Sequence, residues 1–272
     1  MSARSTTLDI DGAAIHVTER GAGPALLLVH GGLGSGAEWA PLTELLADRF
    51  RVLTPDSRGH GRSTNPAGAL SYPRLADDLA ALIDALRLDR PTVVGWSDGG
   101  QAVLELALRH PQVAGALVVG GAYPDFATSG LRDTHRGLLG ADQAGVPDLA
   151  HLDAELGPTA DELKALHPGG APRWAELIRQ TASMWLDYPG LPMSAMATIN
   201  TPTLVLAADR DEMIPLELTL ALYRALPAAE LAVAPGSDHG APMTPGRVAV
   251  FAAVIRDFAE RRLPPAVSPT GP

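Results

Sequence analysis

Short apolar runs alternate with helix-like segments along most of this chain, and this order constrains the fold more than any other feature. The apolar runs cover residues 25–30, 51–56, 91–96, 116–121, 202–209 and 231–234, after an expected hairpin at 8–10 and 14–19. Helical spacing of apolar residues follows over 39–46, 72–86, 101–109, 216–226 and 247–262. A continuous apolar run is typical of a strand that is buried on both faces. The order therefore predicts an α/β fold with a mostly parallel, twisted sheet flanked by helices.

The regular alternation stops between Tyr123 and about Ile199. This stretch has no strand-like apolar run, but it has helix-like pieces and many glycines and prolines. A loop of this length without structure would be unusual, so we expect a helical cap over the C-terminal edge of the sheet. The expected division is a core at 1–122 and 200–263, a cap at 123–199, and a disordered tail at 264–272, whose composition is PPAVSPTGP.

Charge and composition exclude several classes of function. The 272 residues carry a formal charge of −10, which argues against nucleic acid or an anionic membrane as a partner. The chain has no cysteine, so disulfides, a thiolate nucleophile and cysteine-ligated metals are excluded. The N-terminal segment lacks the apolar stretch of a signal peptide, and the longest apolar run, 25–29, is too short to span a bilayer. We therefore expect a cytoplasmic protein.

The segment Gly95-Trp96-Ser97-Asp98-Gly99 has the form G-x-S-x-G, directly between a predicted strand and a predicted helix. The glycines allow a sharp turn that lifts the serine oxygen above the sheet, near a helix N-terminus that favours negative charge. A glycine-rich turn with a capping serine is the structural alternative. The position at the end of a buried strand favours Ser97 as a nucleophile.

The run VGWSDGG resembles the nucleophile elbow of the α/β-hydrolase superfamily. Other segments come in that family's order: the His30-Gly31-Gly32 turn, residues 56–63, and late acid and histidine segments. The resemblance extends from about residue 6 to 262, is weakest in the expected cap, and is greatest to the esterase branch that includes valacyclovir-hydrolase-like proteins. It implies the α/β-hydrolase fold, a serine esterase activity, and no cofactor or metal.

A serine nucleophile needs a histidine base and an acid that orients it. Of eight histidines, His239 alone lies after Ser97 at the C-terminal end of a predicted strand, which agrees with the family's Ser–Asp–His order. His30 and His60 are expected to brace glycine-rich turns. His16 is expected in an edge strand and His110 at the end of a helix. The other three, His135, His151 and His167, are expected on the surface of the cap.

Three acidic residues compete for the orienting role after the strand at 202–209, namely Asp209, Asp211 and Glu212. In the resembled family the acid stands three residues after a small residue and four before a proline. Asp211 meets this spacing with Ala208 and Pro215, although the family usually has glycine where Ala208 stands. Asp209 remains an alternative, and so does Asp125, since some relatives carry the acid after the preceding strand.

Backbone N–H groups that bind the developing oxyanion are expected from two loops. The residue after the nucleophile, Asp98, supplies one, and the resemblance assigns the other to Gly32, with Leu33 as a possible substitute. Candidate substrate-binding residues are Leu33, Trp96, Asp98, Trp174 and Trp185, for which packing between cap and core is the alternative. The Asp98 carboxylate is expected either to pair with a substrate amine or, more commonly, to bond nearby loop groups.

The sequence therefore predicts a serine hydrolase that cleaves a carboxylic ester, or a related acyl bond, of a small molecule through an acyl-enzyme on Ser97. Lactonase, thioesterase and carbon–carbon-bond hydrolase activities remain alternatives, because they can use the same three residues. The aspartate-based route of epoxide and haloalkane hydrolysis is disfavoured by the serine at position 97. A non-catalytic small-molecule-binding protein of the same fold is the remaining alternative.

Overall fold

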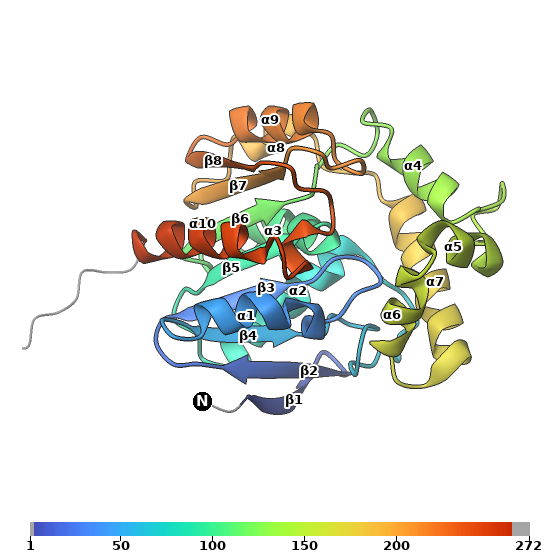
Figure 1. Cartoon of the computed structure of the whole chain (residues 1–272), viewed down its shortest axis with the longest axis horizontal. Coiled ribbons are helices and arrows are strands. Elements are labelled where there is room, and N and C mark those ends of the chain that lie inside the picture. Colours follow the sequence, from blue (N-terminus) through green and yellow to red (C-terminus); the bar gives the residue numbers. More distant parts are fainter. Residues whose placement is uncertain (1–2, 263–272) are drawn as a thin grey trace, which may run out of the picture.

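An eight-stranded sheet forms the centre of the computed structural model, which describes residues 3–262 (Figure 1). The strands are β1 (Arg4–Ile10), β2 (Ala13–Arg20), β3 (Ala25–Val29), β4 (Arg51–Pro55), β5 (Thr92–Trp96), β6 (Ala116–Gly120), β7 (Thr203–Ala208) and β8 (Ala229–Ala234). Their spatial order is β1-β2-β4-β3-β5-β6-β7-β8. All pairs from β4 to β8 are parallel, whereas β2 pairs antiparallel with both β1 and β4. The mostly parallel sheet predicted from the sequence is confirmed, but His16 lies on an interior strand and not on an edge.

Helices cover both faces of the sheet. They are α1 (Ala40–Leu46), α2 (Tyr72–Ala85), α3 (Asp98–Arg109), α9 (Leu216–Ala225) and α10 (Val248–Glu260), with α4 (Leu131–Leu138), α5 (Leu149–Leu156), α6 (Thr159–Ala165), α7 (Gly170–Asp187) and α8 (Met193–Met196) between β6 and β7. Short 3-10 helices occupy Gly36–Trp39 and Ala241–Met243. In the described part of the chain, none of these helices is both long and apolar enough to cross a membrane.

Alternate residues of the central strands point into two separate hydrophobic cores. On β3, Leu27 and Val29 join the core beneath α2, α3 and α9, whereas Leu26 and Leu28 join the core beneath α1 and α10. Each fully buried side chain of this size contributes about 1.5–3 kcal/mol to folding. The sheet is therefore held rigidly from both faces, which fixes the positions of the loops at its ends.

Helices α4 to α7 form a continuous group beyond one end of the sheet, drawn in green to yellow in Figure 1. The group meets the start of α3 and the loop after β3, because Trp185 of α7 bonds Asp98, and His167, which precedes α7, bonds Leu33. Helix α8 packs instead against α9. We propose that α4 to α7 constitute the cap expected at 123–199; the tail expected at 264–272 lies outside the described residues.

Helix α3 begins at Asp98, three residues before the start expected from apolar periodicity. Gly99 and Gly100 are therefore helical, whereas the sequence predicted that they belong to the turn before the helix. The reason is close packing: a Cβ atom at Gly99 would overlap the carbonyl oxygen of Val29, and one at Gly100 would lie 2.8 Å from the Cβ atom of Ala122. The two glycines allow the first turn of α3 to contact the ends of β3 and β6.

Candidate active site

Ser97 occupies a sharp turn between β5 and α3. Its backbone has φ 56° and ψ −123°, a region that costs a residue with a side chain about 1–3 kcal/mol. The turn is held because Ser97 N–H donates to the Gly120 carbonyl at 2.9 Å, and Gln101 N–H donates to the Ser97 carbonyl at 3.0 Å. A Cβ atom at Gly95 would overlap the backbone of Gly99. The strained turn holds Ser97 at the C-terminal end of β5 and the N-terminus of α3.

His239 and Asp211 form a hydrogen-bonded pair across two loops. The Nδ1 atom of His239 lies 2.8 Å from Oδ2 of Asp211, and the other carboxylate oxygen accepts from the N–H groups of Met213 at 2.9 Å and Ile214 at 2.8 Å. An ionised carboxylate can only accept, so Nδ1 of His239 carries the hydrogen and Nε2 is left as an acceptor. The histidine side chain is 25% exposed and the aspartate side chain only 2%, so the imidazole can be reached from solvent.

Trp96 joins this pair to the nucleophile turn. Its Nε1–H donates to the carbonyl of His239 at 2.9 Å, and the two rings lie 5.9 Å apart. The indole is buried and its ring meets Phe251 of α10 edge-on at 5.6 Å. The residue that precedes Ser97 therefore contacts both the His239 loop and the core, and these contacts match the packing alternative for Trp96.

The other candidate acids are engaged elsewhere. Asp209 accepts from Ser237 N–H at 2.9 Å, and the N–H groups of Gly236 and Ser237 lower the pKa of its carboxyl. Asp125 accepts from Ala127 and Thr128 within its own turn. Glu212 is exposed. Of the acids weighed from the sequence, Asp211 is the one that the structure brings to His239.

Three backbone N–H groups beside Ser97 donate to no other residue in the described chain: those of Gly32, Leu33 and Asp98. Asp98 is the first residue of α3, where the helix dipole adds partial positive charge. Gly31 lies against the nucleophile, since a Cβ atom there would be 3.1 Å from Cβ and 3.6 Å from Oγ of Ser97. The Asp98 N–H thus directly follows Ser97 in the chain, and the Gly32 N–H directly follows the glycine that lies against the serine side chain.

The Asp98 side chain is buried, with 7% of the residue exposed. Oδ1 accepts from the Tyr72 hydroxyl at 2.7 Å, and Trp185 Nε1–H lies 2.8 Å from Oδ2 and 3.0 Å from Oδ1. Burial raises the pKa of the Asp98 carboxyl to about 6, against the opposing effect of both donors. These contacts match the structural role for this carboxylate, which here ties the nucleophile helix to α2 and α7.

The other candidate substrate-binding residues are Trp185, Leu33 and Trp174, and all three are buried. Trp185 is next to the predicted oxyanion loop, since a Cβ atom at Gly32 would lie 2.6 Å from its ring. Leu33 is buried with φ 62°. Trp174, on α7 of the cap, is buried with its ring 5.9 Å from that of His167, and it does not line the cavity at Ser97. Its contacts match the packing alternative.

A small cavity of about 20 Å³ adjoins Ser97, enough for roughly one water molecule. Its walls include Tyr72, Gln101, Tyr123, Phe126, Leu131, His135 and Ile214. Sequence reasoning missed these residues as part of the site. Leu131 and His135 are four residues apart on α4 and share a helix face, which is the signal that could have identified His135.

The expectation that three cap histidines lie on the surface is wrong for two of them. His135 is 8% exposed and stacks on Trp185 with ring centroids 4.5 Å apart, and His167 is 2% exposed. His151 is half-buried. Histidine is polar in a sequence pattern, but a neutral imidazole is buried readily when its nitrogens find partners or its ring stacks.

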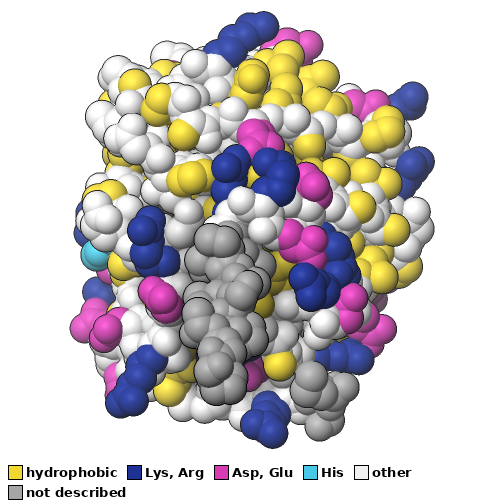
Figure 2. All heavy atoms as spheres, turned by 90° about the vertical axis from the view of Figure 1, so that its left-hand side faces the viewer, with side chains coloured by type: hydrophobic (Ala, Val, Ile, Leu, Met, Phe, Trp, Pro, Cys, Tyr) yellow, Lys and Arg dark blue, Asp and Glu magenta, His cyan; other side chains and the backbone are white. Residues whose placement is uncertain are grey.

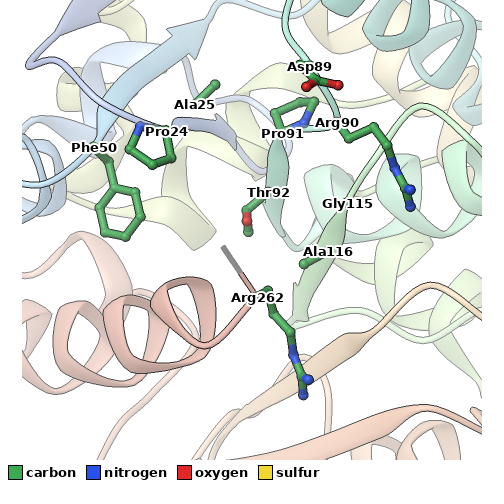
Figure 3. Close-up of a pocket in the computed structure, with 10 residues that line it drawn as sticks. All are labelled: Pro24, Ala25, Phe50, Asp89, Arg90, Pro91, Thr92, Gly115, Ala116 and Arg262. Carbon is green, nitrogen blue, oxygen red and sulfur yellow. The ribbon is translucent and has the colours of Figure 1, made fainter. Parts of the chain in front are cut away.

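A much larger cavity, about 660 Å³, lies at the opposite end of the sheet (Figure 3). It is lined by Pro24, Ala25, Phe50, Asp89, Arg90, Pro91, Thr92, Gly115, Ala116 and Arg262, which include the first residues of β3, β5 and β6. Ligands of parallel α/β sheets bind at the carboxyl ends of the strands, so this cavity is separate from the Ser97 site.

On the face turned away from the cap, side chains of both charges are intermixed (Figure 2).

Among residues 3–262, no group of three or more His, Asp or Glu side chains is arranged to hold a metal ion. The site at Ser97 contains a hydroxyl, an imidazole–carboxylate pair and backbone donors. These groups can carry out acid–base and nucleophilic chemistry by themselves.

Known proteins of similar sequence and structure are hydrolases. Residues 26–254 match the model of the alpha/beta hydrolase family. The chain is 35% identical over 227 residues to a putative carbamate hydrolase RutD of Caulobacter sp. strain K31, covering 78% of this chain and 82% of the relative. It is 30% identical over 261 residues to the 2-hydroxymuconate semialdehyde hydrolase of Pseudomonas sp. strain CF600, covering 91% and 90%. The solved structure of the esterase EaEST of Exiguobacterium antarcticum superposes with a TM-score of 0.80 at 20% identity. The superposition covers 94% of this chain and 100% of the esterase.

The chain belongs to the alpha/beta hydrolase family. Its fold is the α/β-hydrolase fold that the sequence predicted, and it is a hydrolase. The matches extend across several hydrolase activities and do not single out the valacyclovir-hydrolase-like branch.

Proposed function

We propose that this hydrolase cleaves a carboxylic ester or a related acyl bond of a small molecule, with Ser97 as nucleophile, His239 as general base and Asp211 as the acid that orients the imidazole. The observation that carries the proposal is the strained turn at Ser97, which Trp96 joins to the hydrogen-bonded His239–Asp211 pair. A non-catalytic binding protein would have no need of an ordered carboxylate on a histidine whose loop contacts this half-buried serine turn.

The proposed cycle begins when Nε2 of His239 takes the proton of the Ser97 hydroxyl as its oxygen attacks the substrate carbonyl. The tetrahedral oxyanion collapses, the carbon–oxygen bond to the leaving group breaks, and His239 gives its proton to that leaving group. Water, deprotonated by the same imidazole, then attacks the acyl-enzyme and releases the acid and free Ser97. Asp211 stabilises the imidazolium at each stage and keeps its own charge.

The N–H groups of Gly32 and Asp98 are the proposed donors to the oxyanion, with Leu33 as the substitute. All three are unpaired within the described chain, and Asp98 directly follows Ser97 while Gly32 directly follows Gly31, which lies against the serine side chain. Each such donor contributes roughly 3–4 kcal/mol to transition-state stabilisation where it has been removed by mutation. An anion that forms only after attack is therefore favoured over the neutral substrate carbonyl.

The acyl group that reaches Ser97 is expected to be small or to displace side chains of the cap, because the cavity holds roughly one water molecule. Its walls combine aromatic and aliphatic side chains with polar ones, among them Gln101 and His135. Relatives are named for carbamate and for 2-hydroxymuconate semialdehyde, so carbamates and carbon–carbon bonds belong in any substrate panel beside esters. The buried contacts of Asp98 favour substrates without a required amine.

The test is a comparison of wild type and Ser97→Ala on p-nitrophenyl esters of increasing acyl length, lactones, thioesters, a carbamate and, for carbon–carbon bonds, 2-hydroxymuconate semialdehyde. We expect ester hydrolysis that falls at least about 10³-fold in the variant, and a fluorophosphonate probe that labels Ser97 in the wild type alone. Hydrolysis that survives the substitution, or folded wild-type protein that forms no adduct, would refute the assignment. Faster turnover of another class in the panel would keep the nucleophile and replace the substrate.

A further inference from the structure

His167 connects the cap to two loops of the core through both of its ring nitrogens. It lies in the turn between α6 and α7 and is 2% exposed. The N–H of Gly61 donates to Nδ1 at 2.8 Å, and Nε2 lies 2.8 Å from the carbonyl oxygen of Leu33. Because an N–H can only donate and a carbonyl can only accept, Nε2 carries the hydrogen and the imidazole is neutral.

Leu33 belongs to the loop that presents the proposed oxyanion donor. Its φ of 62° is a left-handed conformation, uncommon for a residue with a branched side chain, and it persists only where neighbouring contacts hold it. Peptide planarity means that a bond to a carbonyl also orients the following N–H. His167 therefore orients the 33–34 peptide, while Nδ1–H of His30 donates to the Gly31 carbonyl at 2.7 Å and orients the N–H of Gly32.

The 33–34 peptide is in turn connected to the Gly32 donor. The N–H of Gly34 points to the Gly31 carbonyl at 3.4 Å, the same oxygen that His30 binds. A shift of the Leu33 carbonyl would move the Gly34 N–H, which is the second donor, beside His30, to the carbonyl that shares a peptide plane with the Gly32 N–H. Hydrogen bonding at the oxyanion depends on donor placement within a few tenths of an ångström.

The surroundings of His167 keep the ring uncharged. Burial lowers the pKa of His167, and Arg173 of α7 acts in the same direction, while the Leu33 carbonyl and Asp56 oppose them. The ring of His60 lies 6.2 Å away, and His30 lies 5.0 Å beyond His60. A proton on Nδ1 would break the bond from Gly61, because that nitrogen would no longer accept.

We propose that His167 is a positioning residue for hydrolysis: its imidazole fixes the loop at 31–34, so that the cap holds the oxyanion donor of Gly32 in place. The proposal rests on the proposed function of Ser97 and Gly32. It adds that a cap residue acts on the chemical step and not on substrate affinity alone.

The experiment compares His167→Leu, which loses both hydrogen bonds, with His167→Gln, whose amide has one donor and one acceptor. We expect kcat for the best ester to fall about 10–100-fold in the leucine variant, and KM to change by less than about threefold. The fall in kcat is smaller than the fall caused by losing an oxyanion donor completely, because the Gly32 N–H is displaced and not removed. The glutamine variant should recover at least half of that loss on a logarithmic scale. His151→Leu is the matched control, since His151 also bonds a backbone carbonyl in the cap, that of Gly137 at 2.9 Å.

Three results would overturn the proposal: an unchanged kcat in His167→Leu, an equal fall in the His151 control, or no recovery in a folded glutamine variant. A leucine variant that fails to fold leaves the glutamine comparison and an NMR measurement on wild type. The ¹⁵N shifts of His167 should show the Nε2–H form, unchanged from pH 8 to pH 6, and a titrating or Nδ1–H ring would refute it. This readout needs no substrate, so its failure is distinguishable from an absence of Ser97-dependent hydrolysis.

Discussion

Asp211 divides its two carboxylate oxygens between two tasks. Oδ1 accepts from the N–H groups of Met213 and Ile214, which fixes the loop after β7, and Oδ2 contacts His239. The residue therefore sets both the position of a loop and the tautomer of an imidazole. These tasks can be separated by a substitution that keeps one oxygen.

The substitution Asp211→Asn should reduce kcat about 10³–10⁴-fold with little loss of stability. The remaining carbonyl oxygen can still accept from the loop, but the amide would donate to Nδ1 of His239 and move the ring hydrogen to Nε2. That tautomer cannot take the Ser97 proton. Steady-state kinetics and thermal unfolding of the variant measure the two effects.

Asp209→Asn is the matched control, two residues away on the same loop and bonded to Ser237 instead of His239. We expect its kcat to stay within about threefold of wild type. A large loss in this control, together with an active Asp211→Asn variant, would transfer the orienting role to Asp209.

At the scale of elements, α7 is the helix that fastens the cap to the core. It carries two buried tryptophans, of which Trp185 donates to the Asp98 carboxylate, whereas Nε1 of Trp174 has no partner in the described chain. Since both indoles are buried to a similar extent, replacing either by phenylalanine removes similar apolar area. The two substitutions differ chiefly in the hydrogen bond.

We therefore expect Trp185→Phe to lower the free energy of unfolding by about 1.5–3 kcal/mol more than Trp174→Phe, the cost of removing a donor from a buried charged acceptor. Urea denaturation of both variants at pH 7.5 measures the difference. Equal losses would mean that the bond to Asp98 contributes nothing beyond packing.

Across the whole molecule, buried ionisable groups make stability depend on pH in opposing directions. Burial lowers the pKa of His30 and of His135 to about 4, so both are neutral in the fold. An unfolded histidine takes up a proton near pH 6.5, so the stability from these residues is complete above that pH and is lost toward pH 4. Burial also raises the pKa of Glu38 to about 7 and that of Asp98 to about 6, which favours the fold as pH falls.

Because these effects oppose each other, the prediction concerns a difference between two proteins. Relative to wild type, His135→Phe should gain about 2 kcal/mol of stability between pH 7 and pH 4.5, since it removes one group that must stay neutral. Denaturant unfolding at several pH values measures this, with His151→Phe as a control for the loss of a cap histidine. Parallel stability curves for wild type and His135→Phe would contradict the assigned cause.

What the sequence determined by itself was local in origin. Apolar runs that end in glycine predict buried strands from their own residues, and the strand–turn–helix context of Ser97 is contained in about a dozen neighbours, so the sheet and the position of the serine turn could both be predicted. The start of α3 was misplaced, because the glycines at 99 and 100 are there for packing against β3 and β6, contacts that no local pattern records.

Only the tertiary structure decided between acids and between buried and exposed histidines. Asp209, Asp211 and Asp125 all follow strands, and the selection of Asp211 depends on a contact with a residue 28 positions away. His135 and His167 are polar in the sequence, and their burial depends on which helix face the cap turns toward the core. Local propensity fixes strands and turns, whereas hydrogen bonds between distant loops exist only once the sheet has set those loops side by side.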